Sequence, residues 1–329
     1  MEKKIAALRE IVFGSKENEL AAAALEVFHF QVVKNPVYAS FVHYLGLEPG
    51  SVDRLEKIPF MPIEFFKRKK ILLDGERVQF EFGSSGTGGP DRSVHYVSRP
   101  EIYRESYLKT FRQFYGEPSD WIMVALLPSY LERKDSSLIY MMNGLMEASN
   151  QPEQGFFSTL NEDFLLHLKK LQSHQKKILL VGVTFALLEL CERINFPLRN
   201  CVILETGGMK GKGKEITREE LHLILQEKLQ PKSIHAEYGM TELFSQAYAT
   251  EKGLFQTPPW MKVLIREVND PFAYCPTGKT GGINVIDLAN LCSCSFIATK
   301  DLGKIHPDGS FEVLGRFDYS DIRGCNLLV

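Results

Sequence analysis

The chain has 329 residues, which allows one large domain or two ordinary ones and a sizeable apolar core. Its formal net charge of −2 excludes the strongly positive field of a nucleic-acid-binding protein. No apolar run reaches the roughly 18 residues of a membrane span, and the N-terminus lacks the apolar core of a signal peptide, so we expect a cytoplasmic protein.

The first predicted elements are helices. The stretch Ala21–Phe28 is rich in strong helix formers. Further on, Ser98 and Glu101 have the spacing of a capping box, with Pro100 in the first turn, and they predict a helix that ends near Tyr115.

A glycine-rich loop from Phe82 to Arg92 lies between these helices. Its glycines allow successive backbone N–H groups to face one concavity, and its hydroxyls add donors. The loop therefore predicts a polyphosphate site, although a flexible turn is the commoner meaning of such composition. It is not a Walker loop, because no Gly-Lys-Ser/Thr follows. The expected phosphate-binding residues are Ser84, Ser85, Gly86, Thr87 and Arg92.

Strands and helices then alternate. The expected strands are Trp121–Leu127, Ile178–Val183, Cys201–Leu204 and Ser233–Ala236. The expected helices are Asn161–Leu171, a second helix that ends near Ile194, and a third that follows the capping box of Thr217 and Glu220. This alternation predicts an α/β fold in which helices cover a largely parallel sheet. Ligands of such sheets bind beyond the carboxyl ends of the strands, where Gly207, Gly208, Tyr238 and Gly239 are expected.

The segment that follows the last of these strands reads Glu237-Tyr-Gly-Met-Thr-Glu242. We expect Tyr238 to stack on a base, Thr241 to donate to a phosphate, and Glu242 to hold Mg²⁺, which prefers oxygen ligands and phosphate partners.

The C-terminal part predicts a β-hairpin. Gly303–Ile305 and Phe311–Leu314 flank the turn signal Pro307–Ser310. Asp301 precedes the hairpin and Arg316 follows it, so a carboxylate and a guanidinium are expected to clamp a ribose diol. A surface ion pair is the plainer interpretation.

The order Ser-Ser-Gly-Thr, Tyr-Gly-x-Thr-Glu, Thr-x-Asp and Gly-Arg-x-Asp resembles the motif order of the adenylate-forming enzymes. More narrowly, Ile58–Pro62 and the tail around Cys325 resemble the LuxE-type acyl-protein synthetases. The resemblance implies the large-domain fold of that superfamily, with ATP and Mg²⁺ used to activate a carboxylic acid, most readily a fatty acid. The resemblance begins near Ile58, and it implies an ATP-binding adenylation domain over residues 76–329 that ends in a short tail. The helix formers of the N-terminal segment predict a helical part over residues 1–75.

Two departures from the superfamily pattern are visible. In the glycine loop, Gly88, Asp91 and Arg92 stand where Thr or Ser, a small or apolar residue, and Lys are usual. Typical members also continue with a C-terminal lobe of roughly a hundred residues that carries a lysine. We expect no full lobe of that kind here, and no residue of this sequence is assigned the lysine's role.

The six cysteines include no zinc or redox spacing, so neither disulfides nor zinc are expected. The resemblance assigns Cys325 as an acyl acceptor that passes the acyl group to a partner, such as a reductase. One alternative is a ligase whose acceptor is coenzyme A or a carrier protein, with a structural Cys325. The other is an inactive nucleotide-binding regulatory subunit.

Overall fold

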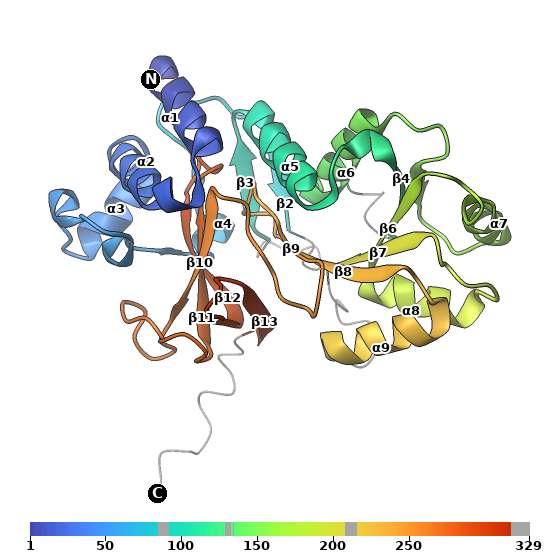
Figure 1. Ribbon diagram of the computed structural model, residues 1–329. Helices are drawn as coiled ribbons and strands as arrows, with labels where there is room; N and C mark the ends of the chain where they lie inside the picture. The colour runs from blue at the N-terminus through green and yellow to red at the C-terminus, as the bar shows by residue number, and fades with distance from the viewer. Residues whose placement is uncertain (85–91, 129–132, 134, 208–215, 317–329) are drawn as a thin grey trace, which may run out of the picture.

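The computed structural model describes residues 1–84, 92–128, 133, 135–207 and 216–316. Within them lie a six-stranded sheet, a five-stranded sheet and a two-stranded hairpin, each with helices packed against it (Figure 1). None of the helices described combines the length and apolar character that a membrane crossing needs.

The six-stranded sheet has the order β5-β4-β6-β7-β8-β9, and every pairing in it is parallel except that of β8 with β9. Its strands are β4 (Trp121–Leu126), β5 (Gly155–Phe157), β6 (Lys177–Val183), β7 (Cys201–Thr206), β8 (Ser233–Tyr238) and β9 (Ala247–Ala249). Strands β4 and β7 are buried along their whole length, because helices cover both faces, and this explains their continuous apolar sequences.

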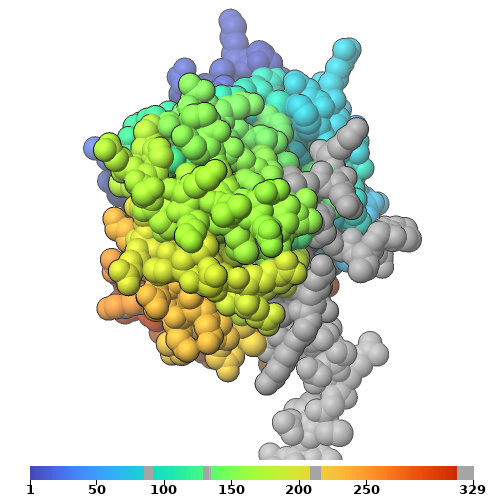
Figure 2. Space-filling model, turned by 90° about the vertical axis from the view of Figure 1, so that its right-hand side faces the viewer, coloured from blue at the N-terminus to red at the C-terminus, as the bar shows by residue number. Residues whose placement is uncertain are grey.

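Helices α5 (Pro100–Tyr115) and α6 (Ser137–Ser149) cover one face of this sheet, and α8 (Thr184–Arg193) and α9 (Arg218–Leu229) cover the other (Figure 1). Helix α7 (Glu162–Leu171) lies at the far edge. Figure 2 looks onto that edge, where the segments coloured green to yellow form the surface.

The five-stranded sheet has the order β1-β12-β11-β10, with β13 paired to β12, and it is antiparallel except for β1. Its strands are β1 (Met61–Pro62), β10 (Met261–Arg266), β11 (Gly281–Asp287), β12 (Phe296–Ile305) and β13 (Phe311–Arg316). Strands β12 and β13 form the predicted C-terminal hairpin.

The N-terminal helices are α1 (Glu2–Gly14), α2 (Leu20–Lys34), α3 (Pro36–Tyr44) and the short α4 (Phe65–Arg68). Helix α2 is fixed to the loop before β12 by Gln31, which is fully buried. The Gln31 side-chain amide donates to the carbonyl oxygens of Asn290 (2.8 Å) and Leu291 (3.1 Å), and its oxygen accepts from the backbone N–H of Ser295 (3.0 Å).

Local signals explain most helix starts. At α9, the Thr217 hydroxyl accepts from the Glu220 N–H, and the Glu220 carboxylate accepts from the Thr217 N–H, which is the predicted capping box. At α5 the predicted capping box is wrong. The helix begins at Pro100, with Arg99 as N-cap and no side-chain cap, so Ser98 lies one residue too early to cap it.

Candidate functional site

The carboxyl ends of β7 and β8 are neighbours in the parallel sheet. Strand β7 ends at Thr206 and is followed by Gly207, whose φ of +75° is a conformation that glycine adopts readily. Strand β8 ends at Tyr238 and is followed by Gly239. The two predicted glycine turns therefore open at the same edge of the sheet, where α/β proteins bind ligands.

Tyr238 connects this edge to the second sheet. Its hydroxyl donates to Asp301 Oδ2 at 2.8 Å, and its ring packs against the rings of Phe255 and Phe311, with centroids 5.9 and 5.7 Å away. The tyrosine is 7% exposed, so ring and hydroxyl are both held in place.

Asp301 and Arg316 are directly opposed on β12 and β13, and Arg316 Nε donates to Asp301 Oδ1 at 3.3 Å. The Asp301 N–H also donates to the Thr299 hydroxyl at 3.1 Å. The aspartate side chain is 11% exposed, whereas that of Arg316 is 76% exposed. The guanidinium is therefore open to a ligand while the carboxylate is fixed below it.

Glu242 lies beside this pair in the buried interior. Burial raises the pKa of its carboxyl group, and the nearby Asp301 adds to the increase, while a hydrogen bond from the Ser93 hydroxyl and the charge of Arg316 oppose it. The Glu242 carbonyl oxygen accepts from the Asn290 amide at 2.8 Å. The carboxylate therefore lies within the electrostatic field of the Asp301–Arg316 pair.

The glycine-rich segment stands in the sequence between β2 (Phe80–Gly83) and β3 (Val94–Val97), and these two strands pair antiparallel. At its base the N–H of Ser84 donates to the Ser93 carbonyl at 3.0 Å, and the Ser84 hydroxyl accepts from the Ser93 N–H at 3.1 Å. Ser93 is therefore fixed to Ser84 by two hydrogen bonds.

Two arginines stand at this base. Arg92 forms an ion pair with Asp135. Arg133 donates to the carbonyl oxygens of Gly83 (2.5 Å) and Ser84 (3.0 Å). Sequence reasoning found Arg92 but missed Arg133, because no recognisable spacing links Arg133 to the glycine loop.

His95 on β3 is a second residue that the sequence did not reveal. It is fully buried, and its Nδ1 lies 2.9 Å from the carbonyl oxygen of Thr241. Its ring stacks on Phe244 with centroids 4.7 Å apart. Burial lowers the pKa of the imidazole to about 4, so the ring is neutral at pH 7, and its Nδ1–H donates a hydrogen bond to the Thr241 carbonyl oxygen. The hairpin thus positions the backbone of the Thr241–Glu242 segment.

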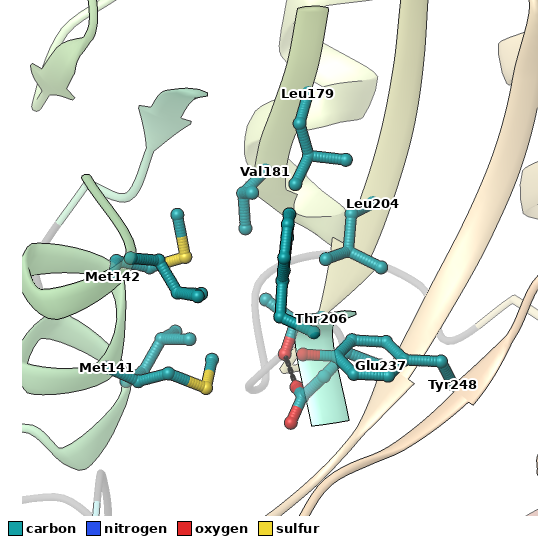
Figure 3. Close-up of a pocket in the computed structure, with 11 residues that line it drawn as sticks. Met141, Met142, Leu179, Val181, Leu204, Thr206, Glu237 and Tyr248 are labelled. Carbon is teal, nitrogen blue, oxygen red and sulfur yellow. Dashed lines mark hydrogen bonds between the residues drawn. The ribbon is translucent and has the colours of Figure 1, made fainter. Parts of the chain in front are cut away.

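An apolar pocket lies next to these strand ends, between the sheet and helices α5 and α6 (Figure 3). Its polar lining consists of Thr206, Glu237 and the hydroxyl-bearing Tyr248, and its cavity volume is about 10 Å³, room for about one water molecule. The apolar lining residues are Phe111, Leu138, Met141, Met142, Leu145, Leu179, Val181 and Leu204.

Among the predicted site residues, hydrogen bonds join Tyr238, Asp301 and Arg316, and Gly207 and Gly239 follow neighbouring strands of the sheet. Glu242 is buried within the field of Asp301 and Arg316. Ser84 and Arg92 lie at the base of the β2–β3 hairpin, and the Thr241 carbonyl contacts His95 of β3. Five further predicted residues, Ser85, Gly86, Thr87, Gly208 and Cys325, lie outside the described residues.

No family model and no curated protein matches the chain. Solved structures do match it. A 2-hydroxyisobutyryl-CoA ligase in complex with 2-HIB-AMP and CoA aligns with 91% of this chain and 70% of its own, at 13% identity and a TM-score of 0.69. ATP-bound MatB from Rhodopseudomonas palustris aligns with 73% of this chain at 18% identity and a TM-score of 0.55. A luciferase-like enzyme from the mealworm Zophobas morio aligns with 75% at 14% identity, also with a TM-score of 0.55.

This chain spans about half the length of the MatB structures, 48% of that chain, and 59% of the luciferase-like enzyme. The chain therefore has the same fold as these solved structures.

Proposed function

We propose that the protein uses ATP to activate a carboxylic acid as an acyl-adenylate. The observation that carries the proposal is that the neighbouring ends of β7 and β8 meet the hydrogen-bonded unit of Tyr238, Asp301 and Arg316 beside a narrow apolar pocket. This arrangement puts groups suited to phosphate and ribose next to a narrow apolar pocket, which would have to widen to admit an acyl group. The fold shared with a ligase that was solved with an acyl-AMP supports the same reading.

The proposed reaction makes the carboxyl carbon of the acid reactive towards nucleophiles. A carboxylate is a poor electrophile, because its charge repels nucleophiles and oxide is a bad leaving group. In the proposed reaction, a carboxylate oxygen attacks the α-phosphorus of ATP, the bond to the β-phosphate oxygen breaks, and pyrophosphate leaves. The acyl carbon then carries AMP as a good leaving group.

Each predicted residue has a role in this scheme. The glycine loop with Ser84, Ser85, Gly86, Thr87 and Arg92 would donate to the phosphates, together with Thr241. Asp301 would accept from the ribose hydroxyls beside the exposed Arg316. Tyr238 would hold Asp301 in place, and the turns at Gly207, Gly208 and Gly239 would let the backbone approach the nucleotide.

Glu242 fits a magnesium ion by the chemistry of its donors. Its carboxylate is buried near a second carboxylate, Asp301, and this raises its pKa when no further cation is near. The described residues hold no group of three or more His, Cys, Asp or Glu side chains that would bind a metal by themselves. Mg²⁺ commonly takes one or two carboxylates and completes its shell with phosphate and water. When bound, it would supply positive charge to the phosphates.

The LuxE-type resemblance adds a finer proposal, in which the acid is fatty and Cys325 accepts the acyl group and passes it to a partner protein. Transfer to coenzyme A, or to the thiol of a carrier protein, is the competing proposal. It is favoured by the ligase that shares this fold and was solved with CoA.

ATP–pyrophosphate exchange against a panel of carboxylic acids tests the adenylation. Exchange that depends on a particular acid supports adenylation. If no acid gives exchange, adenylation is contradicted, and the alternative of an inactive nucleotide-binding regulatory subunit is favoured. Radiolabelled acid then separates the acceptors. A hydroxylamine-sensitive label on the protein supports Cys325, whereas exchange without label and with acyl-CoA formation supports coenzyme A.

A further inference from the structure

A buried loop connects the N-terminal helices to the segment that follows β8. Residues 288–295 join β11 to β12, and every one of them is buried, whereas connecting loops usually run over the surface. Gln31 of α2 donates to the Asn290 carbonyl oxygen at 2.8 Å. Asn35, the residue after α2, donates to the Ser293 carbonyl oxygen at 2.8 Å. Since buried backbone groups need such partners, the N-terminal helices fix the conformation of the loop.

The same loop holds the backbone of Glu242. Asn290 Nδ2 donates to the Glu242 carbonyl oxygen at 2.8 Å. Asn290 is fully buried, and within the described residues its Oδ1 has no hydrogen-bond partner. A buried amide that is only half paired costs stability. Its presence is therefore better explained by the one contact that its side chain makes, which is the contact with Glu242.

Asp287, at the end of β11, holds the residues that follow Glu242. It is fully buried, and its Oδ2 accepts from the N–H groups of Phe244 (2.7 Å) and Ser245 (3.0 Å). Its Oδ1 accepts from the Ser245 hydroxyl (2.6 Å) and from the N–H of Ala289 (3.2 Å), at the start of the loop. Residues 241–245 belong to no helix or strand, so these side-chain contacts take the place of regular backbone hydrogen bonds.

We propose, on the basis of the adenylation function above, that Asn290 and Asp287 are positioning residues that fix the Glu242 backbone and thereby place its carboxylate in the proposed magnesium site. Neither residue contacts the metal or ATP in this proposal. The partners that orient a metal ligand commonly change metal affinity by about 10- to 100-fold when they are lost. Because α2 holds the loop that carries Asn290, the N-terminal helices contribute to the site from a distance.

Magnesium-dependent ATP binding tests the proposal without turnover, because no acid is added. The affinity for ATP is measured by calorimetry in EDTA and again in excess magnesium chloride, and the ratio of the two affinities is the magnesium enhancement. Asn290→Ala should reduce the enhancement by about 10-fold and leave the affinity in EDTA unchanged. Partial unfolding would not give this result, because a smaller folded fraction lowers the amount of bound ATP under both conditions.

Asn200→Ala is the matched control. The Asn200 amide also donates to a backbone carbonyl oxygen at 2.8 Å, that of His174, but Asn200 directly precedes β7 and lies at the amino end of that strand. This variant should keep the full enhancement. If Asn290→Ala does not fold, as judged by circular dichroism, Asp287→Asn makes the same test. It replaces an acceptor oxygen by a donor, breaks at least one of the four hydrogen bonds of Asp287, and should also reduce the enhancement.

The outcomes separate this proposal from the adenylation function. An enhancement that Asn290→Ala and Asp287→Asn leave intact, or that Asn200→Ala reduces equally, overturns the positioning role whether or not pyrophosphate exchange is found. A reduced enhancement in Asn290→Ala, with no exchange by the wild-type protein, supports the positioning role and contradicts adenylation. If the wild-type protein binds ATP equally well with and without magnesium, the positioning role is overturned, and acid-dependent exchange still decides adenylation.

Discussion

The hydroxyl of Tyr238 lies 2.8 Å from Asp301 Oδ2, and this contact joins the last strand of the parallel stretch to the C-terminal hairpin. One residue belongs to the Tyr-Gly-Met-Thr-Glu segment and the other to the Thr-x-Asp segment. Two motifs that were separate in the sequence are therefore parts of one hydrogen-bonded unit, and the predictions below follow from that unit and its neighbours.

Tyr238→Phe should lower the free energy of unfolding by about 1–3 kcal/mol, because the buried Asp301 loses a donor. The substitution should also weaken ATP binding, since Asp301 loses the hydrogen bond from Tyr238 that fixes its carboxylate. Urea unfolding and calorimetric titration with ATP measure the two effects. Tyr44→Phe, at an 87% exposed position, is the control and should change neither. Equal stability of the Tyr238 and Tyr44 variants would contradict the structural role.

Arg316→Ala should separate binding from stability. Its side chain is 76% exposed, so its ion pair with Asp301 should contribute only about 0–1 kcal/mol to the free energy of unfolding. ATP binding should nevertheless weaken by about 10-fold or more if the guanidinium contacts the nucleotide. Unchanged affinity for ATP in a stable variant would show that the pair is a surface ion pair and nothing else.

Glu242→Gln should reduce Mg²⁺-dependent pyrophosphate exchange by roughly 100-fold or more without loss of fold. Since burial raises the pKa of this carboxyl group, its ionised form is disfavoured in the folded state, and the neutral amide should leave stability at pH 7 unchanged or higher. Exchange is assayed across a magnesium titration beside thermal unfolding. Full activity in this variant removes Glu242 from the proposed metal site.

His95→Asn tests the pH dependence of stability. The folded-state pKa of His95 is about 4, below its ordinary 6.5, so the unfolded chain binds more protons between these values. Stability should therefore fall as the pH drops from 6.5 towards 4, by about 3 kcal/mol for this group.

Asparagine keeps an N–H that can reach the Thr241 carbonyl but does not titrate, so unfolding curves of His95→Asn should show a smaller loss over that interval. His235, whose pKa is also lowered to about 4, would account for part of the remaining loss. His43→Asn, at an exposed position, is the matched control. An unchanged profile in the His95 variant would contradict the assignment.

Cys325→Ser should abolish covalent acyl labelling and preserve pyrophosphate exchange, if Cys325 is the acceptor. Cys191→Ser and Cys292→Ser should keep the label, because burial raises the pKa of these two thiols to about 11 and about 12 and leaves little reactive thiolate. Labelled acid and mass spectrometry of the peptides measure this directly. A label that survives in Cys325→Ser would favour coenzyme A or a carrier protein as acceptor.

Local signals made much of the fold predictable. The N-cap at Asn161 and the capping box at Thr217 are short-range hydrogen bonds, and the residues that make them are adjacent in sequence. The apolar strands β4 and β7 were equally clear, because burial on both faces removes polar residues from them.

The features that were not predicted depend on contacts between residues far apart in the sequence. Helix α6 carries Gly144 in its interior, a residue that local propensity counts against a helix. A Cβ atom at this position would lie 1.8 Å from the Tyr107 hydroxyl of α5, so the glycine is needed for the close contact between α6 and α5. That contact joins residues far apart in the sequence, and local propensity does not predict it. His95 and Arg133 were missed for the same reason, since their partners are Thr241 and the Gly83–Ser84 backbone.

The hydrogen bonds of Gln31 have a consequence for folding during synthesis on the ribosome. Its partners, Asn290, Leu291 and Ser295, are synthesised about 260 residues later, so helix α2 leaves the ribosome long before its docking surface exists. During synthesis at roughly 5–20 residues per second, this helix waits for at least about ten seconds before the segment that Gln31 binds has been made, although α1 and α3 can already pack against it. The early chain is therefore the stage at which chaperone binding and aggregation would compete with folding, and truncation before β12 would leave α2 without its partner.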